Sequence, residues 1–281
     1  MSKQNFIRCV DDLFESIEFT GIQNNDFAFR GQVNENWPIS STVMRDGKGK
    51  PLAYQKSRKI ELATFKSLIN GSKSNFCRTY HPIEHLMNLQ HHSIPTRLID
   101  WTKDPLVALF FSCYDKSSSF CQFHGKLFLF LIFEKDFKHY DLFYNKDDQK
   151  HKEYNLKLIK QSVGELLKLK ELKILDPLIK NPRMRAQAGI FTLIPLWESD
   201  INKDYCKNFK EMLDEISSPL AYHLVHKDYK TEILEELKET YGISEETLFI
   251  NTKKIVKADD HSLNVHKEDI EYIKGLFDID I

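Results

Sequence analysis

The chain is poor in the residues and patterns that mark several protein classes. It has ten glycines and nine prolines among 281 residues, which excludes a collagen-like or low-complexity chain. Its five cysteines are scattered without a CxxC pair, so neither a disulfide framework nor a zinc finger is predicted. Lysine and arginine number 40 against 41 acidic residues. This balance gives no general electrostatic attraction to nucleic acid or to an anionic membrane.

Long apolar segments are also missing. The most apolar window, residues 126–133, is too short to span a bilayer and instead predicts a buried strand. The first residues, MSKQNFIRCVDDLFESI, lack the uninterrupted apolar stretch of a secretory signal. We therefore expect a cytoplasmic protein with reduced cysteines and no membrane partner.

What the sequence does have is a 41% share of hydrophobic residues, enough for a substantial core, arranged in both helical and strand-like periods. We predict one α+β domain over residues 1–281, with a mixed, mainly antiparallel sheet and packed helices. A lysine-rich helical insertion is expected at about 137–176. The predicted helices cover 6–19, 54–69, 82–91, 105–114, 156–175, 229–240 and 267–277, and the predicted strands cover 27–29, 97–100, 126–133, 183–195 and 221–225.

Two polar segments are candidates for a functional site. Arg30 ends a short aromatic strand and precedes Gly31, so its guanidinium could bind a phosphate or carboxylate, or form an internal ion pair. Asp100 lies on a half-buried extended segment, where its carboxylate needs a donor: a backbone amide, Arg30 or a histidine. Thr102 or Asp104 could cap the following helix.

Metal chemistry has little support in the sequence. His91 and His92 are adjacent on a predicted helix, and adjacent helical residues point in different directions. No HExxH motif and no paired-carboxylate spacing for Mg²⁺ occurs. We therefore predict no metal cofactor.

Several of these segments together resemble one family. They are FRGQ at 29–32, Glu61, LQHHSIPTRLIDWTKDPLVALFFSCY at 89–114 and RAQAGIF at 185–191. They are similar to the FRG domain, which has a characteristic QH-aromatic-GxPTRLLDWT run and is widespread in bacteria and phages. His92, Ser93 and Ser112 depart from that pattern. The resemblance implies a bacterial FRG-type domain.

A second similarity, to ADP-ribosyltransferases of the arginine–serine–glutamate type, rests on the order of three elements. An aromatic-Arg-Gly strand is followed by a strand and helix at 98–112 and by a third element at 187–191. This similarity implies an ADP-ribosyltransferase-like fold and NAD as substrate. Gln187 stands where that family has a glutamate, and Gln cannot supply its negative charge. The implied catalytic residues are Arg30, Asp100 and Gln187, and the implied NAD-binding residues are Arg30, Gly31, His91, Arg97 and Thr102.

The resulting functional hypothesis is an ADP-ribosyltransferase or NAD glycohydrolase with a toxin or phage-defence role and a protein or nucleic-acid acceptor. The alternative is a non-enzymatic module that recognises a nucleotide or nucleic acid with the same polar pocket. A metal-free hydrolase built on His91 and Asp100 is the third hypothesis. A cleft that gathers Arg30, Arg97, Asp100 and Gln187 would favour a site, whereas an Arg30–Asp100 pair in a closed core would favour a structural role.

Overall fold

The computed structural model describes part of the chain. The described residues are 6–18, 27–45, 52, 54–71, 86–87, 90, 95–116, 119–132, 172–176, 182–195 and 220–250. His91, residues 137–171 of the expected insertion and the expected helix at 267–277 lie outside them.

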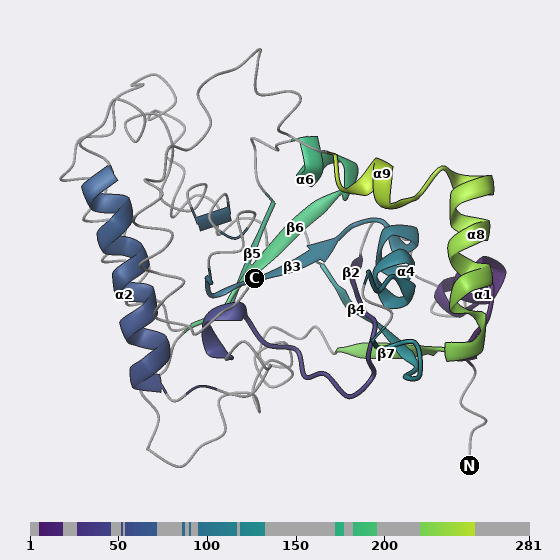
Figure 1. The fold of residues 1–281 in the computed structure, drawn as a ribbon, viewed down its shortest axis with the longest axis horizontal. Coiled ribbons are helices and arrows are strands. Elements are labelled where there is room, and N and C mark those ends of the chain that lie inside the picture. Colours follow the sequence, from purple (N-terminus) through teal and green to yellow (C-terminus); the bar gives the residue numbers. More distant parts are fainter. Residues whose placement is uncertain are drawn as a thin grey trace.

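A seven-stranded sheet runs through the described residues in the order β1-β7-β4-β2-β3-β6-β5 (Figure 1). The pairing of β1 with β7 is parallel and the other pairings are antiparallel, which confirms the predicted mixed, mainly antiparallel sheet. The strands are β1 (Phe6–Ile7), β2 (Phe27–Gln32), β3 (Leu98–Thr102), β4 (Gly125–Leu131), β5 (Lys173–Leu175), β6 (Gly189–Leu193) and β7 (Ala221–Val225).

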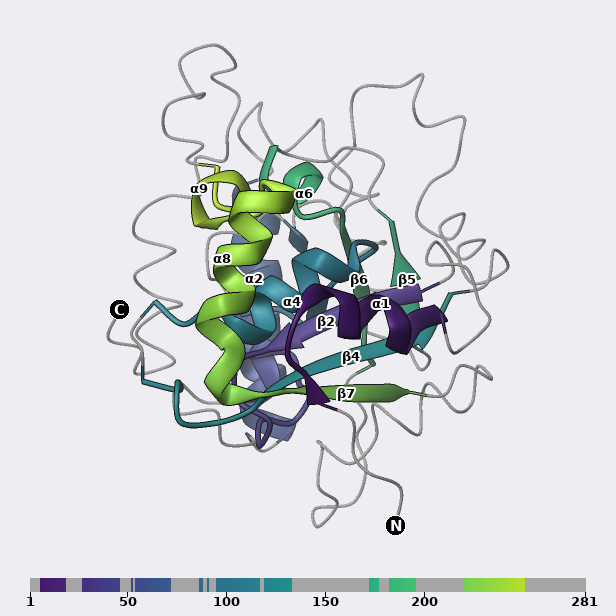
Figure 2. The ribbon, with the colours of Figure 1, turned by 90° about the vertical axis from the view of Figure 1, so that its right-hand side faces the viewer.

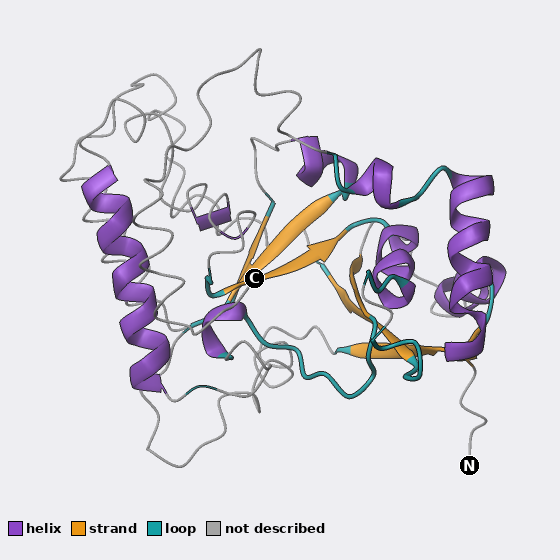
Figure 3. Ribbon diagram, in the orientation of Figure 1, coloured by secondary structure: helices purple, strands orange, loops and turns teal. Residues whose placement is uncertain are grey.

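Helices lie around this sheet, and together they give the expected α+β class (Figure 3). The long helix α2 lies at the opposite end of the molecule from α8 (Figure 1). The helices are α1 (Val10–Glu18), α2 (Tyr54–Gly71), α4 (Pro105–Cys113), α6 (Pro182–Ala186), α8 (Lys230–Tyr241) and α9 (Glu245–Leu248), with short 3-10 turns at η2 (Thr42–Met44) and η7 (Lys227–Tyr229).

The sheet has a seam between β2 and β3. On one side, β2 stays in register with β4 from Phe27↔Leu131 to Gln32↔Lys126. Toward β3, the described part of β2 is in register at Phe29↔Thr102 alone. We call this place the β2–β3 seam. It separates the strands β1, β7, β4 and β2 from the strands β3, β6 and β5.

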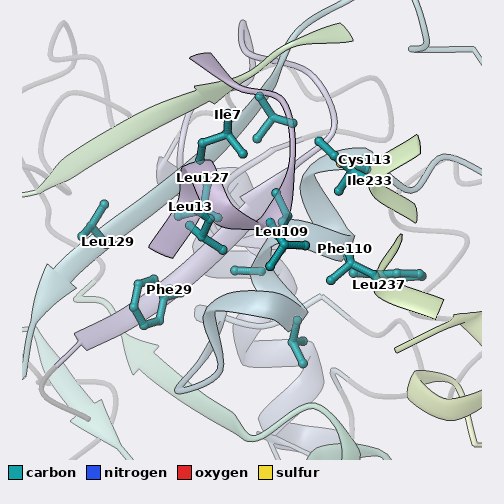
Figure 4. Packing of buried hydrophobic residues seen from close by; sticks show 14 of the residues in the cluster. Ile7, Leu13, Phe29, Leu109, Phe110, Cys113, Leu127, Leu129, Ile233 and Leu237 are labelled. Carbon is teal, nitrogen blue, oxygen red and sulfur yellow. The ribbon is translucent and has the colours of Figure 1, made fainter. Parts of the chain in front are cut away.

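One face of the β1-β7-β4-β2 group is covered by α1, α4 and α8 (Figure 2). Strand alternation puts Phe27 and Phe29 on this face, and helical spacing supplies Leu13 of α1 and Ile233 of α8. Figure 4 shows their side chains packed together with those of α4 and β4. Burial of apolar side chains against these helices is the main favourable contribution to this half of the fold.

Helix α4 lies directly against β2 at Gly31. A Cβ built at Gly31 would be 1.9 Å from the Ala108 carbonyl oxygen and 2.5 Å from the Ser112 amide nitrogen. These are backbone atoms of a helix, so no side-chain rotation could relieve the overlap. Glycine at this position is therefore a packing requirement, which gives the Phe-Arg-Gly motif a structural component.

The predicted end signals of α4 and α8 are confirmed. Pro105 opens α4, and the Asp104 side chain accepts a hydrogen bond from the Leu106 amide at 2.8 Å. Thr102 Oγ1 accepts from the Asp104 amide at 2.9 Å, which fixes the capping residue. Gly242 ends α8 with a left-handed φ of 66°.

Three predicted segments differ from the structure. The strand expected at 183–195 divides into α6 and β6, because Pro182 opens a helix of good helix-forming residues before Gly189. The helix expected at 156–175 is wrong at its end, since Lys173–Leu175 is the edge strand β5, paired with β6. The helix expected at 6–19 begins only at Val10, after the short strand β1.

Candidate functional site

Arg30 lies on β2 and contacts β3 across the seam. Its Nη1 donates a hydrogen bond of 2.7 Å to the main-chain oxygen of Asp100 on β3. Its Nε is buried and binds no acceptor among the described residues. Burial lowers the pKa of Arg30, the Asp100 carboxylate opposes that shift, and the nearby charge of Arg45 adds to it. The seam therefore holds a half-buried arginine whose hydrogen-bonding capacity is only partly used.

Asp100 combines a buried backbone with an exposed side chain. It is the exposed member of β3, whose other residues are buried. Its partner in the sheet on the side away from the seam is Phe191 of β6. Phe29 is in register with Thr102, so strand alternation places the Asp100 carboxylate on the face of Phe29 and the Arg30 side chain on the opposite face. The Arg30–Asp100 contact runs through a main-chain oxygen and leaves the carboxylate available.

Arg97 lies just before β3, and its side chain is buried. Its side chain is 1% exposed, and its Nε and Nη2 donate to the two carboxylate oxygens of Glu61 on α2. Arg58 Nη1 also lies 3.3 Å from Glu61. This bidentate pair joins α2 to the start of β3. The predicted role of Arg97 in ligand binding stays a prediction, while the structure gives its guanidinium a buried protein partner.

Gln187 lies in the turn between α6 and β6. Its Nε2 donates to the main-chain oxygen of Leu248 at 3.1 Å, so the side chain attaches α9 to this turn. The next residue, Ala188, has a φ of 44°, which is uncommon for a residue with a Cβ. Its main-chain oxygen accepts from the Lys103 amide at 3.1 Å. These two hydrogen bonds attach the turn to α9 and to Lys103. The catalytic role of Gln187 stays a prediction.

The remaining predicted site residues also make structural contacts. Gly31 faces the backbone of α4, and Thr102 is buried and holds the Asp104 amide. His91 lies outside the described residues. Of the four side chains whose convergence was in question, Arg30 contacts the main-chain oxygen of Asp100, while Arg97 and Gln187 bind other partners.

The structure adds a residue that the sequence reasoning did not select. Arg183 of α6 is half-buried, and its Cζ lies 4.7 Å from the centroid of the Phe249 ring. Burial lowers the pKa of Arg183, and the Asp100 carboxylate raises it. The available signal was the RAQAGIF similarity, which begins two residues after Arg183.

The described residues contain neither a cluster of metal-binding side chains nor a membrane-spanning helix. No group of three or more His, Cys, Asp or Glu side chains is arranged to hold a metal ion there. No helix in the described part of the chain is long and apolar enough to cross a membrane.

Comparison with known proteins agrees with the motif analysis. The family model of the FRG domain matches residues 25–120, which include β2, β3 and α4. No curated protein and no solved structure shows a significant match to the chain. The matched segment contains the Phe-Arg-Gly strand, the strand that it meets at the seam, and the helix that Gly31 packs against. Residues 25–120 of the chain therefore contain an FRG domain.

Proposed function

We propose that this FRG-domain protein binds NAD at the β2–β3 seam and acts as an ADP-ribosyltransferase-like effector, with a toxin or phage-defence role in a bacterium. The observation that carries the proposal is the half-buried arginine at the seam, Arg30, whose buried Nε has no acceptor among the described residues. The order of the Phe-Arg-Gly and Leu-Ile-Asp-Trp-Thr strands is similar to that in ADP-ribosyltransferases, and this similarity supports the transferase hypothesis.

The first step of the argument concerns charge. Arginine stays protonated in proteins, so burial at the seam leaves a cation with an unused N–H. Buried polar groups are normally hydrogen-bonded, and an orphaned one costs free energy. A phosphate oxygen of NAD would accept from Nε and would compensate the charge at the same time.

The second step concerns the reaction. In the transfer, the bond between ribose C1′ and nicotinamide breaks, nicotinamide leaves, and an acceptor oxygen or nitrogen bonds to C1′ and loses a proton. Positive charge develops on the ribose, and a nearby carboxylate stabilises it. Asp100 is the carboxylate whose charge raises the pKa of Arg30, whereas Gln187 is neutral and attached to Leu248. We assign the electrostatic role to Asp100.

The second candidate is a non-enzymatic module that recognises a nucleotide or nucleic acid at the same seam. One observation favours it: the side chains of Arg97 and Gln187 are engaged in internal contacts. A binding site needs the Arg30 cation but no catalytic carboxylate. The two candidates therefore differ in what they require of Asp100.

The test is nicotinamide release from NAD, together with the thermal shift that NAD produces. We compare the unchanged protein with Arg30→Gln, Asp100→Asn and the matched control Arg8→Gln, which alters an exposed arginine beside β1. A transferase or glycohydrolase loses release in both seam variants and keeps it in the control. A recognition module gives no release but shows a thermal shift that requires Arg30. If neither signal is present, the NAD proposal is wrong.

Asp100→Asn is the sharper of the two seam variants. Its side chain is exposed and the Arg30 hydrogen bond uses the main-chain oxygen, so the substitution removes charge while keeping that contact. We expect an unchanged melting temperature without ligand. A lower melting temperature would show that the carboxylate serves the fold, and any loss of release would then have a structural explanation.

A further inference from the structure

We propose that the sheet face turned away from α1, α4 and α8 carries a nucleotide-binding platform. The base stacks on the ring of Tyr222, and Lys126 and Arg30 bind the phosphates. This inference deepens the proposed function, because it rests on a nucleotide bound at Arg30 and states how its base is recognised. It assigns a binding role to β7, which lies beyond the segment matched by the FRG family model.

The register of three neighbouring strands places these side chains on one face of the sheet. Arg30 of β2 is paired with Phe128 of β4, and Phe128 is paired with Tyr222 of β7. Directly opposite residues in antiparallel strands share a face, so the three side chains form one row. Phe29, the neighbour of Arg30 in β2, packs against the helices on the other face. The row therefore lies on the face away from α1, α4 and α8.

Tyr222 is an aromatic side chain that the fold leaves in contact with solvent. It is 51% exposed, the largest value among the exposed large hydrophobic residues of the described chain. Its neighbour in the row, Phe128, is buried, and the centroids of the two rings are 6.1 Å apart. A buried ring thus supports an exposed one. Exposed aromatic rings on a sheet are surfaces on which nucleobases stack.

Lys126 of β4 supplies positive charge beside the exposed ring. Its Nζ lies 4.8 Å from the centroid of the Tyr222 ring and 5.5 Å from that of Phe128. A cation over an aromatic ring is attracted to it, which restrains both side chains. Within the described ranges, no protein acceptor takes a hydrogen bond from this ammonium group. A phosphate oxygen would provide one.

The spacing of the row suits a base that is linked to phosphates. Neighbouring strands are about 4.8 Å apart, so two strand spacings separate Arg30 from Tyr222 by about 10 Å. The phosphates of a nucleoside diphosphate extend away from its base, from Tyr222 past Lys126 toward the buried, unpaired Nε of Arg30. An inorganic anion would leave the aromatic ring unused, and an apolar ligand would leave the two cations unused.

The platform concerns binding and assigns no chemical step. The Asp100 carboxylate lies on the face of Phe29, so it does not face an anion held in this row. The inference is therefore compatible with the recognition module as well as with the transferase.

The experiment measures the affinity of the full chain for ADP and for pyrophosphate, which lacks a base, by titration calorimetry. The variants are Tyr222→Leu, Tyr222→Phe and the matched control Tyr241→Leu, which alters an exposed tyrosine at the end of α8. We expect Tyr222→Leu to weaken ADP binding about fivefold to a hundredfold, the usual effect of removing a stacked ring. Its pyrophosphate affinity should be unchanged. Tyr222→Phe keeps the ring and should bind ADP as the unchanged protein does, as should the control.

Lys126→Gln tests the phosphate end of the platform. Losing a charge-assisted hydrogen bond should weaken ADP and pyrophosphate binding alike, by about tenfold. Lys126→Arg keeps the charge and should retain most of the affinity. Lys238→Gln, which alters an exposed lysine of α8, is the matched control. An ADP affinity of Lys126→Gln equal to that of the unchanged protein would overturn the role of Lys126.

The outcomes separate this inference from the proposed function. If Arg30→Gln weakens ADP binding and Tyr222→Leu does not, the inference is wrong while the Arg30 site stands. If Tyr222→Leu weakens ADP binding and Arg30→Gln does not, the platform stands and the site at Arg30 is wrong. If Tyr222→Leu weakens ADP and pyrophosphate equally, Tyr222 has a structural role and the inference is wrong. If the unchanged protein binds neither ligand, both proposals are wrong.

Single-stranded oligothymidine tests the other occupant that an aromatic and basic sheet face could take. We expect it to bind more weakly than ADP, because the row holds one exposed ring and a short span of positive charge. Tighter binding of the oligonucleotide, with the same dependence on Tyr222, would overturn the assignment of this face to a nucleotide.

Discussion

The two sides of the β2–β3 seam bury different kinds of side chains. On the side of β2, the face toward α1, α4 and α8 is filled by apolar residues such as Phe29 and Leu109. On the side of β3, the protein buries the Arg97–Glu61 pair and a hydrogen bond of 3.0 Å from Trp101 to Thr192. The first half is stabilised mainly by non-directional apolar burial, whereas the second combines buried apolar residues such as Ile190 and Leu193 with specific polar partners. Arg30 lies where the two meet.

This difference predicts that adding a single methyl group lowers the stability most in the apolar half. Gly31→Ala places a Cβ against the backbone of α4, which must move away from β2. We expect a loss of stability of about 3 kcal/mol or more, at the upper end of the overpacking range. Urea unfolding followed by circular dichroism measures it.

Gly242→Ala is the control for Gly31→Ala. Nothing lies within 4 Å of a Cβ at Gly242, but its φ of 66° strains any residue with a side chain. The expected cost is about 1 kcal/mol, from backbone conformation alone. Equal costs for the two variants would contradict the close packing of α4 on β2.

On the polar side, breaking the buried ion pair should have the next largest effect. Glu61→Gln leaves the Arg97 guanidinium, which is 1% exposed, without its charged partner. Breaking a buried pair in this way typically costs about 3 kcal/mol. Thermal and urea unfolding of the single variant measure that cost.

The double variant Glu61→Leu with Arg97→Met sharpens the same comparison. Replacing both members of a buried pair by apolar residues is often neutral or stabilising. We expect the double variant to be more stable than Glu61→Gln. A double variant that is less stable than the single one would show that this half requires the polar pair itself.

A smaller loss is expected where the polar contact is neutral. Thr192→Val removes the hydroxyl that accepts from Trp101 Nε1 while keeping the volume of the side chain. The expected cost is about 1 to 2 kcal/mol, the penalty of a lost buried hydrogen bond. Thr192→Ser retains the hydroxyl and is the control. If the serine variant loses more stability than the valine variant, packing rather than the hydrogen bond dominates here.

The smallest predicted effect has the opposite sign. Ala188 has a φ of 44° in the turn after α6, and glycine adopts this conformation without steric strain. Ala188→Gly should stabilise the protein by about 0.5 kcal/mol, after the larger unfolded-state entropy of glycine is considered. Ala186→Gly, at the last residue of α6, relieves no such strain and should destabilise by about 0.5 kcal/mol. Differential scanning calorimetry distinguishes the two signs.

Local sequence signals predicted many of the elements. The strand at 221–225 has its predicted bounds, and the helices at 54 and 105 begin at the predicted residues. These elements are marked by strong periodicity or by start signals such as Asp104-Pro105. The edge strand at Lys173–Leu175 was missed because its pairing with β6 overrides a helical pattern.

The site was less predictable than the fold. The sequence singled out Arg30 and Asp100, and the structure brings them together. The sequence could not show that the Arg97 side chain points toward α2. Whether Arg97 binds a ligand or Glu61 depends on a helix that lies 36 residues away in the chain. The sequence analysis did not select Arg183, because its guanidinium contacts Phe249, a residue that is distant in the chain.

By itself, the sequence determined the α+β class and the FRG domain, and it named Arg30 and Asp100 as candidate residues. Those features are encoded by short-range periodicity and by a contiguous motif. Only the tertiary structure decided which polar side chains are internal partners and which remain available. That decision depends on long-range burial and pairing, because a guanidinium is free or engaged according to what the rest of the chain places beside it.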